Sequence, residues 1–175
     1  MDQVVHSLNE FGYVKAAQLP AEFVADIMNY CQSTRRLKYW NPHKECEAID
    51  QLARNETIVE IAKRYLGAEP ILWLTQLKWS FGDAGERRTF IPSAHLEPLQ
   101  HDGDAFHYDT LDFKSLTVFV YLTSVDIDSG PHVVIEGTHK IKSLTERGQI
   151  ILSDETAKKK YGQRIKVILG DEGTV

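Results

Sequence analysis

The chain has 175 residues, of which 42% are hydrophobic and 26% are charged, and it carries a formal net charge of −5. This length fits one domain with a sizeable core. The acidic balance argues against nucleic-acid binding, and no apolar run of about 18 residues predicts a membrane span. The N-terminal residues lack the basic and apolar regions of a signal peptide, so we expect a cytoplasmic protein.

Residues 1–67 are predicted to be mainly helical. The apolar positions within residues 4–11 share one helix face, and Gly12 stands where this helix would end. Residues 13–15, with the sequence Tyr-Val-Lys, are then a short strand candidate. Pro20 is predicted to open a second helix, because proline suits the first turn.

The best-capped helix is predicted between Asn55 and Gly67. Asn55 can accept hydrogen bonds from first-turn amides, and Gly67 suits the left-handed conformation that often follows a helix. Glu56 near the positive end of the helix, and Lys63 and Arg64 near its negative end, complement the helix dipole. These local signals predict both ends of the helix.

Two features that resemble functional motifs are expected to be structural. Cys31 and Cys46 lack the spacing of a zinc or redox site, so they are predicted to be reduced packing residues. The basic run Lys158–Lys160 follows Asp154 and Glu155 and is best explained as the solvated face of a helix.

From Pro70 onwards the sequence is rich in β-branched and aromatic residues, which favour strands. Strands are predicted at residues 71–81, 105–109, 116–122, 132–136 and 165–169. Residues 82–103 lack periodicity and predict a long loop. Helices followed by strands indicate an α+β fold, with helices packed on an antiparallel sheet or barrel. We expect one domain over residues 1–175, with a helical part at 1–67 and a mainly β core at 70–175.

The predicted strand at 115–122 has two different faces, because side chains alternate along a strand. One face is aliphatic and suits packing against the helices. The other face carries Ser115, Thr117, Phe119 and Tyr121. This second face would suit the lining of a small-molecule cavity, and a half-exposed sheet face gives the same pattern about as often.

The candidate metal ligands are His107 and Asp109, which project from the same face of a strand. A second histidine would complete the triad of two histidines and one carboxylate that holds Fe(II) and leaves coordination positions open. With 7 histidines and 25 acidic residues in the chain, a His-x-acid pattern is expected about once by chance. The pattern is weak by itself, but its place between the predicted loop and the two-faced strand favours a site.

Other histidines beside acidic residues are expected to have different roles. His43-Lys44-Glu45 has the same spacing, but it lies where no strand is predicted, so His43 is expected to be a surface residue. The acids at positions 102 and 104 would face away from His101 on a strand. They are expected to cap or turn the loop.

Four segments of the sequence resemble those of a known protein family. They are FGYVKAAQLPAEFV at 11–24, FHYD at 106–109, SLTVFVYLTSVDIDSGPHVVIEGTHK at 115–140 and GDEGTV at 170–175. In this order and spacing they resemble the phytanoyl-CoA dioxygenase family, Fe(II)- and 2-oxoglutarate-dependent oxygenases. The resemblance implies a double-stranded β-helix (jelly-roll) core with N-terminal helices packed on it.

The resemblance also implies cofactors and site residues. Fe(II) would be bound by His107 and Asp109, which are also the implied catalytic residues, and 2-oxoglutarate would be the cosubstrate for oxidation of a small molecule. Phe119 would abut the 2-oxoglutarate pocket, with Thr117 on the same face. Lys78 could reach a cosubstrate carboxylate, although an exposed strand lysine is the commoner case. A carboxylate at position 109 favours hydroxylation, since halogenating relatives have a small residue there.

The third iron ligand is not expected at His132, which is more typical of a strand residue, or at His139, because the matching histidine of the family is not the distal ligand. In the family that the chain resembles, the third iron ligand is a histidine that follows the segment matched by residues 170–175. An arginine that binds 2-oxoglutarate also lies beyond that segment in the family. We therefore expect the N-terminal portion of a longer oxygenase that lacks the closing strands of its jelly roll. Such a chain would bind Fe(II) weakly and could self-associate through an open sheet edge.

Two other functions remain open on the same residues. The first is a non-catalytic double-stranded β-helix module that binds a partner or small ligand, in which His107 and Asp109 are ordinary polar residues. The second is a cupin-type metal enzyme, which a His-x-His spacing would favour, and no such spacing occurs.

Overall fold

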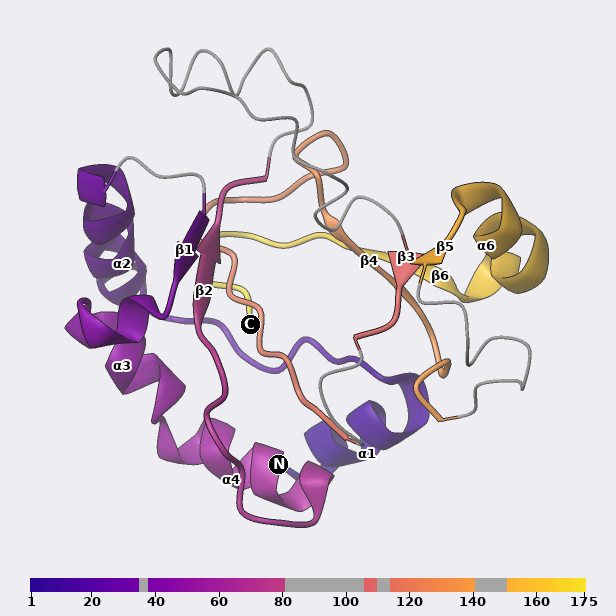
Figure 1. The fold of residues 1–175 in the computed structure, drawn as a ribbon, viewed down its shortest axis with the longest axis horizontal. Helices are drawn as coiled ribbons and strands as arrows, with labels where there is room; N and C mark the ends of the chain where they lie inside the picture. Colours follow the sequence, from indigo (N-terminus) through magenta and orange to yellow (C-terminus); the bar gives the residue numbers. More distant parts are fainter. Residues whose placement is uncertain (35–37, 81–105, 110–113, 141–150) are drawn as a thin grey trace.

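The computed structural model describes residues 1–34, 38–80, 106–109, 114–140 and 151–175 (Figure 1). Within these ranges the chain forms helices and three two-stranded antiparallel sheets. The predicted loop at 82–103 lies outside the described residues.

Two helices of the N-terminal part end where their caps predict. α1 (Asp2–Phe11) and α4 (Glu56–Leu66) contact one another. Gly12 takes a φ of 85°, and its N–H donates to a carbonyl of the last turn of α1 at 3.1 Å. At α4, Asn55 Oδ1 accepts from two first-turn N–H groups at 3.0 and 3.2 Å, and Gly67 closes the helix with a φ of 77°. The structure therefore confirms the predicted ends of both helices.

The best-buried core of the described residues lies between α2 (Ala21–Thr34) and α3 (Glu47–Ala53). α2 begins after Pro20, as predicted. The buried members of this core are Ile27, Cys31, Cys46 and Ile49, and the partly buried side chains of Phe23, Tyr30, Ala48, Leu52, Leu77, Trp79 and Leu122 pack around them. Both cysteines are free thiols, which confirms their predicted packing role, and burial raises the pKa of the Cys31 thiol to about 11.

One strand of the helical part was not predicted. β1 (Lys38–Trp40) pairs antiparallel with β2 (Gln76–Lys78), with Tyr39 opposite Leu77. A 3-10 turn, Pro42–Lys44, then leads into α3. Because Leu77 packs on the core, this strand pair ties residues before and after α4 to the same buried cluster.

The strands of the second half are short and antiparallel. β3 (Phe106–His107) pairs with β5 (Ile151–Leu152), so that His107 lies opposite Ile151. β4 (His132–Ile135) pairs with β6 (Ile165–Ile168). β4 and β6 confirm the predicted strands at 132–136 and 165–169. β3 covers only residues 106–107 of the strand predicted at 105–109, and β2 covers only residues 76–78 of the one predicted at 71–81.

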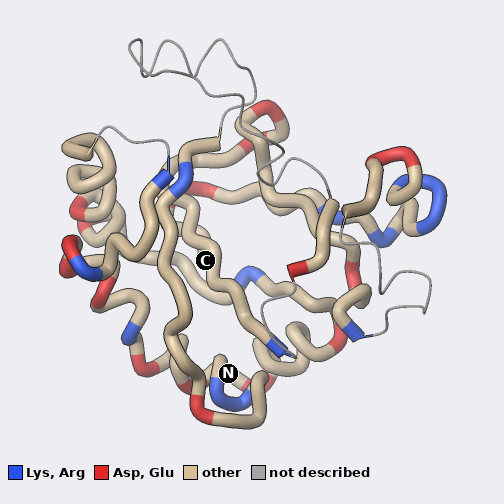
Figure 2. The backbone as a smooth tube through the Cα atoms, viewed as in Figure 1, with Lys and Arg blue, Asp and Glu red and all other residues tan. Residues whose placement is uncertain are grey.

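The link from β5 to β6 is a helix, α6 (Asp154–Tyr161), followed by a 3-10 turn, Gly162–Arg164. The Ser153 Oγ caps α6 by accepting from the Thr156 N–H at 3.3 Å, and Ala157 is fully buried. Figure 2 shows the acidic residues at the start of α6 and its lysines at the other end. The lysines are exposed, which confirms the predicted solvated helix face.

Two predicted strands do not form in the structure. Residues 13–15 are not a strand, and residues 116–122 are not assigned as one; among the described residues, the backbone hydrogen bonds of 116–122 are those of Tyr121 with Gly173 and Thr174. The C-terminal residues 170–175 instead exchange backbone hydrogen bonds with residues 16–19, with Tyr121 and with Val125. The alternating faces and β-branched residues of 116–122 favour a strand, but a strand forms only where a neighbouring segment provides backbone hydrogen bonds.

The short antiparallel sheets neither support nor contradict a double-stranded β-helix. The jelly-roll core and the single domain over residues 1–175 therefore stay predictions. Within the described ranges, every helix is too short or too polar to cross a membrane.

Candidate functional site

The two predicted metal ligands meet in the structure. His107 Nε2 lies 3.4 Å from Asp109 Oδ1, and the side chains are 43% and 57% exposed. Two ligand atoms that bind one ion at right angles, each about 2.1 Å from it, lie roughly 3 Å apart. The separation of this pair therefore fits two neighbouring positions on one metal ion, and the exposure leaves room for further ligands.

An aromatic stack lies beside the pair. The rings of Phe119 and His132 are 4.3 Å apart between centroids and tilted by 35°. Burial lowers the pKa of His132; the charge of Asp109 raises it, and the charges of His107 and Lys78 lower it. These mutual effects place Lys78 of β2, the pair on the β3 segment and His132 of β4 within electrostatic range of one another.

The sequence predicted only part of this group. His132 was expected to be a strand residue, and it is the first residue of β4. Its ring contact with Phe119 joins positions far apart along the chain, so no local pattern could reveal it. Thr117 is exposed and makes no described contact with the pair. Whether Lys78, Thr117 and Phe119 bind a cosubstrate stays a prediction.

No third ligand joins the pair among the described residues. There, no group of three histidine, cysteine or acidic side chains is placed to hold one metal ion. His139 instead lies against the end of α1, where its Nε2 is 3.2 Å from the Asn9 carbonyl oxygen and a Cβ added at Gly12 would lie 2.5 Å from its Nδ1. His139 is thus a packing residue at the junction between α1 and the segment after β4.

The other described His-x-acid pattern has a structural role. His43 Nδ1 is 2.7 Å from Thr75 Oγ1, and Asn41, just before the 3-10 turn, donates its N–H to the Thr75 carbonyl at 2.8 Å. These contacts hold the chain around His43 to the segment before β2. His101 and the acids beside it lie outside the described residues.

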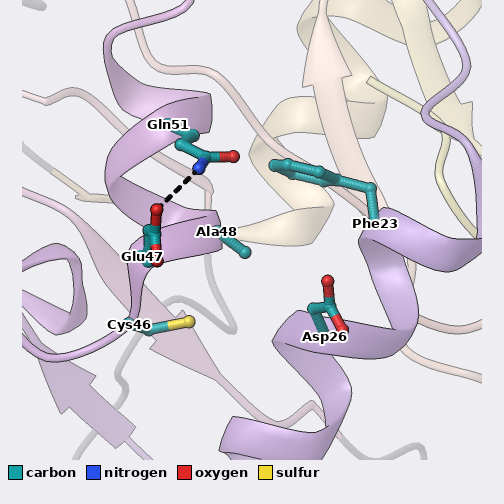
Figure 3. A pocket seen from close by; sticks show the side chains of 6 residues that line it. All are labelled: Phe23, Asp26, Cys46, Glu47, Ala48 and Gln51. Carbon is teal, nitrogen blue, oxygen red and sulfur yellow. Dashed lines mark hydrogen bonds between the residues drawn. The ribbon is translucent and has the colours of Figure 1, made fainter.

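A hollow of about 340 Å³ lies elsewhere, between α2 and α3 (Figure 3). Its lining residues are Phe23, Asp26, Cys46, Glu47, Ala48 and Gln51. Within α3, Gln51 Nε2 donates to Glu47 Oε1 at 3.0 Å. None of the predicted site residues lines this hollow, so the candidate site is assigned to the His107–Asp109 pair on its chemistry and geometry.

Comparisons with protein-family models, with curated proteins and with solved structures found no match to this chain. The function is therefore inferred from the site and from the sequence pattern around it.

Proposed function

We propose that this chain is part of an Fe(II)- and 2-oxoglutarate-dependent dioxygenase that hydroxylates a small-molecule substrate. The approach of His107 Nε2 to Asp109 Oδ1, at 3.4 Å on a half-exposed segment, is the observation that carries the proposal. An imidazole nitrogen and a carboxylate oxygen are two of the three ligands in the facial triad of such enzymes. The resemblance of the surrounding sequence to the phytanoyl-CoA dioxygenase family supports the same assignment.

The residues around the pair have separable roles in this proposal. Bound iron, with 2-oxoglutarate and dioxygen, supplies the oxidation of a substrate C–H bond. His107 holds the ion through a neutral ring nitrogen, and Asp109 contributes a negative charge. Phe119 and His132, both exposed, offer an aromatic surface on which a substrate can stack, and Lys78 attracts a cosubstrate carboxylate.

The affinity for iron alone is expected to be weak. In this proposal the ion has two protein ligands, His107 and Asp109, whose ligand atoms lie 3.4 Å apart. Because 2-oxoglutarate can chelate the metal through two of its own oxygens, it should strengthen iron binding. Binding of the metal and of the cosubstrate should therefore depend on one another.

Anaerobic calorimetry tests this dependence by titrating 2-oxoglutarate into the chain with and without Fe(II). We expect heat of binding only with the metal, and its loss in His107→Ala and in Asp109→Ala. His43→Ala is the matched control, because His43 begins the same His-x-acid spacing but contacts Thr75 instead. This control should retain metal-dependent binding.

A non-catalytic binding module is the competing function, and the stack of Phe119 on His132 favours it, because an aromatic wall can bind a ligand without metal. Binding of 2-oxoglutarate that is unaffected by Fe(II), or no binding in either condition, would contradict the dioxygenase proposal. Equal losses in the His43 control and in the two ligand variants would contradict the assignment of the site.

A further inference from the structure

The strand pair of β1 and β2 has two faces of different character. Tyr39 and Leu77 lie opposite each other, and Leu77 packs on the core between α2 and α3. The ring of Tyr39 meets that of Tyr30 on α2, with 5.8 Å between the centroids. This face is therefore turned toward the helices. Because side chains alternate along a strand, the opposite face carries Lys38, Trp40, Gln76 and Lys78.

Two lysines lie next to each other on this opposite face. Lys38 of β1 and Lys78 of β2 are direct partners in the antiparallel register. Figure 2 shows blue segments side by side on the two strands. The Cβ atoms of such partners are about 4.5–5.5 Å apart, and like charges in this position repel each other. A doubly charged anion held between the two ammonium groups would neutralise both of them.

An exposed aromatic ring stands beside the lysines. Lys38 Nζ lies 4.5 Å from the centroid of the Trp40 ring, which is a cation–π contact on the same face of the strand. Trp40 is 55% exposed, although tryptophan is highly buried on average. Gln76, the partner of Trp40 in the register, is exposed as well. The face thus combines two positive charges, an open indole ring and a side-chain amide.

We propose that this face of β1 and β2 binds a small molecule that carries a phosphate group next to a planar ring. A phosphate monoester has about two negative charges at neutral pH, which match the charges of Lys38 and Lys78, and its oxygens accept hydrogen bonds from ammonium groups. The ring of the ligand stacks on Trp40. The Gln76 amide can donate to a further oxygen of the ligand.

This site goes beyond the proposed function. Of its residues, the proposed function uses only Lys78, and only for a cosubstrate carboxylate. The phosphate site requires neither iron nor 2-oxoglutarate, because its charges and its ring all belong to one strand pair. Since 2-oxoglutarate has no ring to stack on Trp40, it should be a weaker ligand of this face than an aromatic phosphate.

The test is a calorimetric titration of the whole chain with phenyl phosphate and with inorganic phosphate, in the presence of a metal chelator. We expect phenyl phosphate to bind about 5-fold more tightly, because only the ester has a ring that can stack. Trp40→Leu should remove this difference. Lys38→Gln and Lys78→Gln should each weaken the binding of phenyl phosphate about 3-fold to 5-fold, as expected for the loss of one exposed ion pair.

Lys160→Gln is the matched control. Lys160 Nζ also lies beside a ring, 5.2 Å from the centroid of Tyr161, but it belongs to α6 and not to a strand pair. Its substitution should leave the affinity for phenyl phosphate unchanged. The thermal midpoint of every variant is measured without ligand, so that only folded variants are compared. Phenyl phosphate should raise the midpoint of the unsubstituted chain more than that of Lys38→Gln or Lys78→Gln.

The possible outcomes keep this inference apart from the proposed function. If the unsubstituted chain does not bind phenyl phosphate, or if Lys160→Gln weakens binding as much as the substitutions at Lys38 and Lys78, the site is wrong. Equal affinities for phenyl phosphate and inorganic phosphate would contradict the stacking on Trp40 and the ligand class with it. Because the chelator removes iron, any of these results leaves the proposed function standing.

Discussion

The helical part, residues 1–67, and the segment 106–109 that carries the two proposed metal ligands differ in how deeply their side chains are buried. Val24 and Ile27 of α2 are 0% and 2% exposed, and α4 has a cap at each end. β3 has two residues, and His107 and Asp109 are 43% and 57% exposed. Stability is therefore expected to lie mainly in the helices, whereas the proposed chemistry lies on a half-exposed segment with a two-residue strand. A substitution in the helical part should therefore leave metal binding unchanged, and a substitution at His107 or Asp109 should change the free energy of unfolding little.

The largest effect is expected from Ile27→Ala in the helical core. Ile27 is among the most buried side chains, so its truncation should lower the free energy of unfolding by about 2–5 kcal/mol. Urea denaturation measures this loss. Ile71→Ala is the control, because Ile71 is 87% exposed and its loss should cost about 0.5 kcal/mol or less. Equal costs for the two variants would contradict the place of the core.

Gly173→Ala should be the next most harmful change. Both Gly173 and Gly67 have positive φ, 85° and 77°, so alanine at either position costs about 1–2 kcal/mol of backbone strain. At Gly173 the new Cβ would also lie 2.8 Å from the Leu19 carbonyl oxygen, whereas at Gly67 it meets nothing within 4 Å. We expect Gly173→Ala to cost about 1–3 kcal/mol more than Gly67→Ala in urea denaturation. A smaller cost at Gly173 would contradict the close approach of the C-terminal segment to Leu19.

The two helix caps should separate stability from metal binding. Asn55→Ala removes the α4 cap and Ser153→Ala removes the α6 cap, and each should destabilise the chain by about 1 kcal/mol. Only Ser153→Ala should also weaken Fe(II) binding, because Ser153 directly follows β5, which pairs with β3 at His107. Calorimetry with Fe(II) on both variants measures the difference. A loss of iron affinity in Asn55→Ala would contradict the independence of the two regions.

The smallest effect is a pH dependence at the junction of the two regions. Burial lowers the pKa of His139, although the Asn9 carbonyl acts in the opposite direction. The unfolded chain therefore takes up the proton first as the pH falls through about 6.5, and the folded state loses stability below that pH. His139→Gln should show a smaller fall of the thermal midpoint between about pH 7.5 and 5.5 than the unsubstituted chain. An unchanged fall would show that other groups carry the dependence.

Local signals in the sequence were sufficient to predict α1, α2 and α4, whereas α3 was not predicted as a separate helix. Asn55 and Gly67 define the ends of α4 because their effect depends only on neighbouring backbone groups. β1 was missed because its three residues are set by pairing with β2, far along the chain. The strand predicted at 116–122 does not form for the complementary reason: within the described part of the chain, the β-forming residues there find backbone partners near one end, at Tyr121.

The contacts of the candidate site also differ in whether the sequence could predict them. The approach of His107 to Asp109 joins residues two positions apart at the end of β3, so the sequence could predict it. The contact of Phe119 with His132 and the pairing of His107 with Ile151 join distant segments. Such contacts depend on how the strands pair and pack, which no local pattern of residues specifies.

Paramagnetic broadening of amide NMR signals by Mn(II), used in place of Fe(II), tests most directly whether the metal binds at the His107–Asp109 pair. The account predicts that Mn(II) broadens the signals of the β3 segment and of the start of β4, that α2 signals stay sharp, and that Asp109→Ala abolishes the effect. Broadening that is strongest beside Asp26 and Glu47, in the hollow between α2 and α3, or that persists in Asp109→Ala, would contradict the assignment.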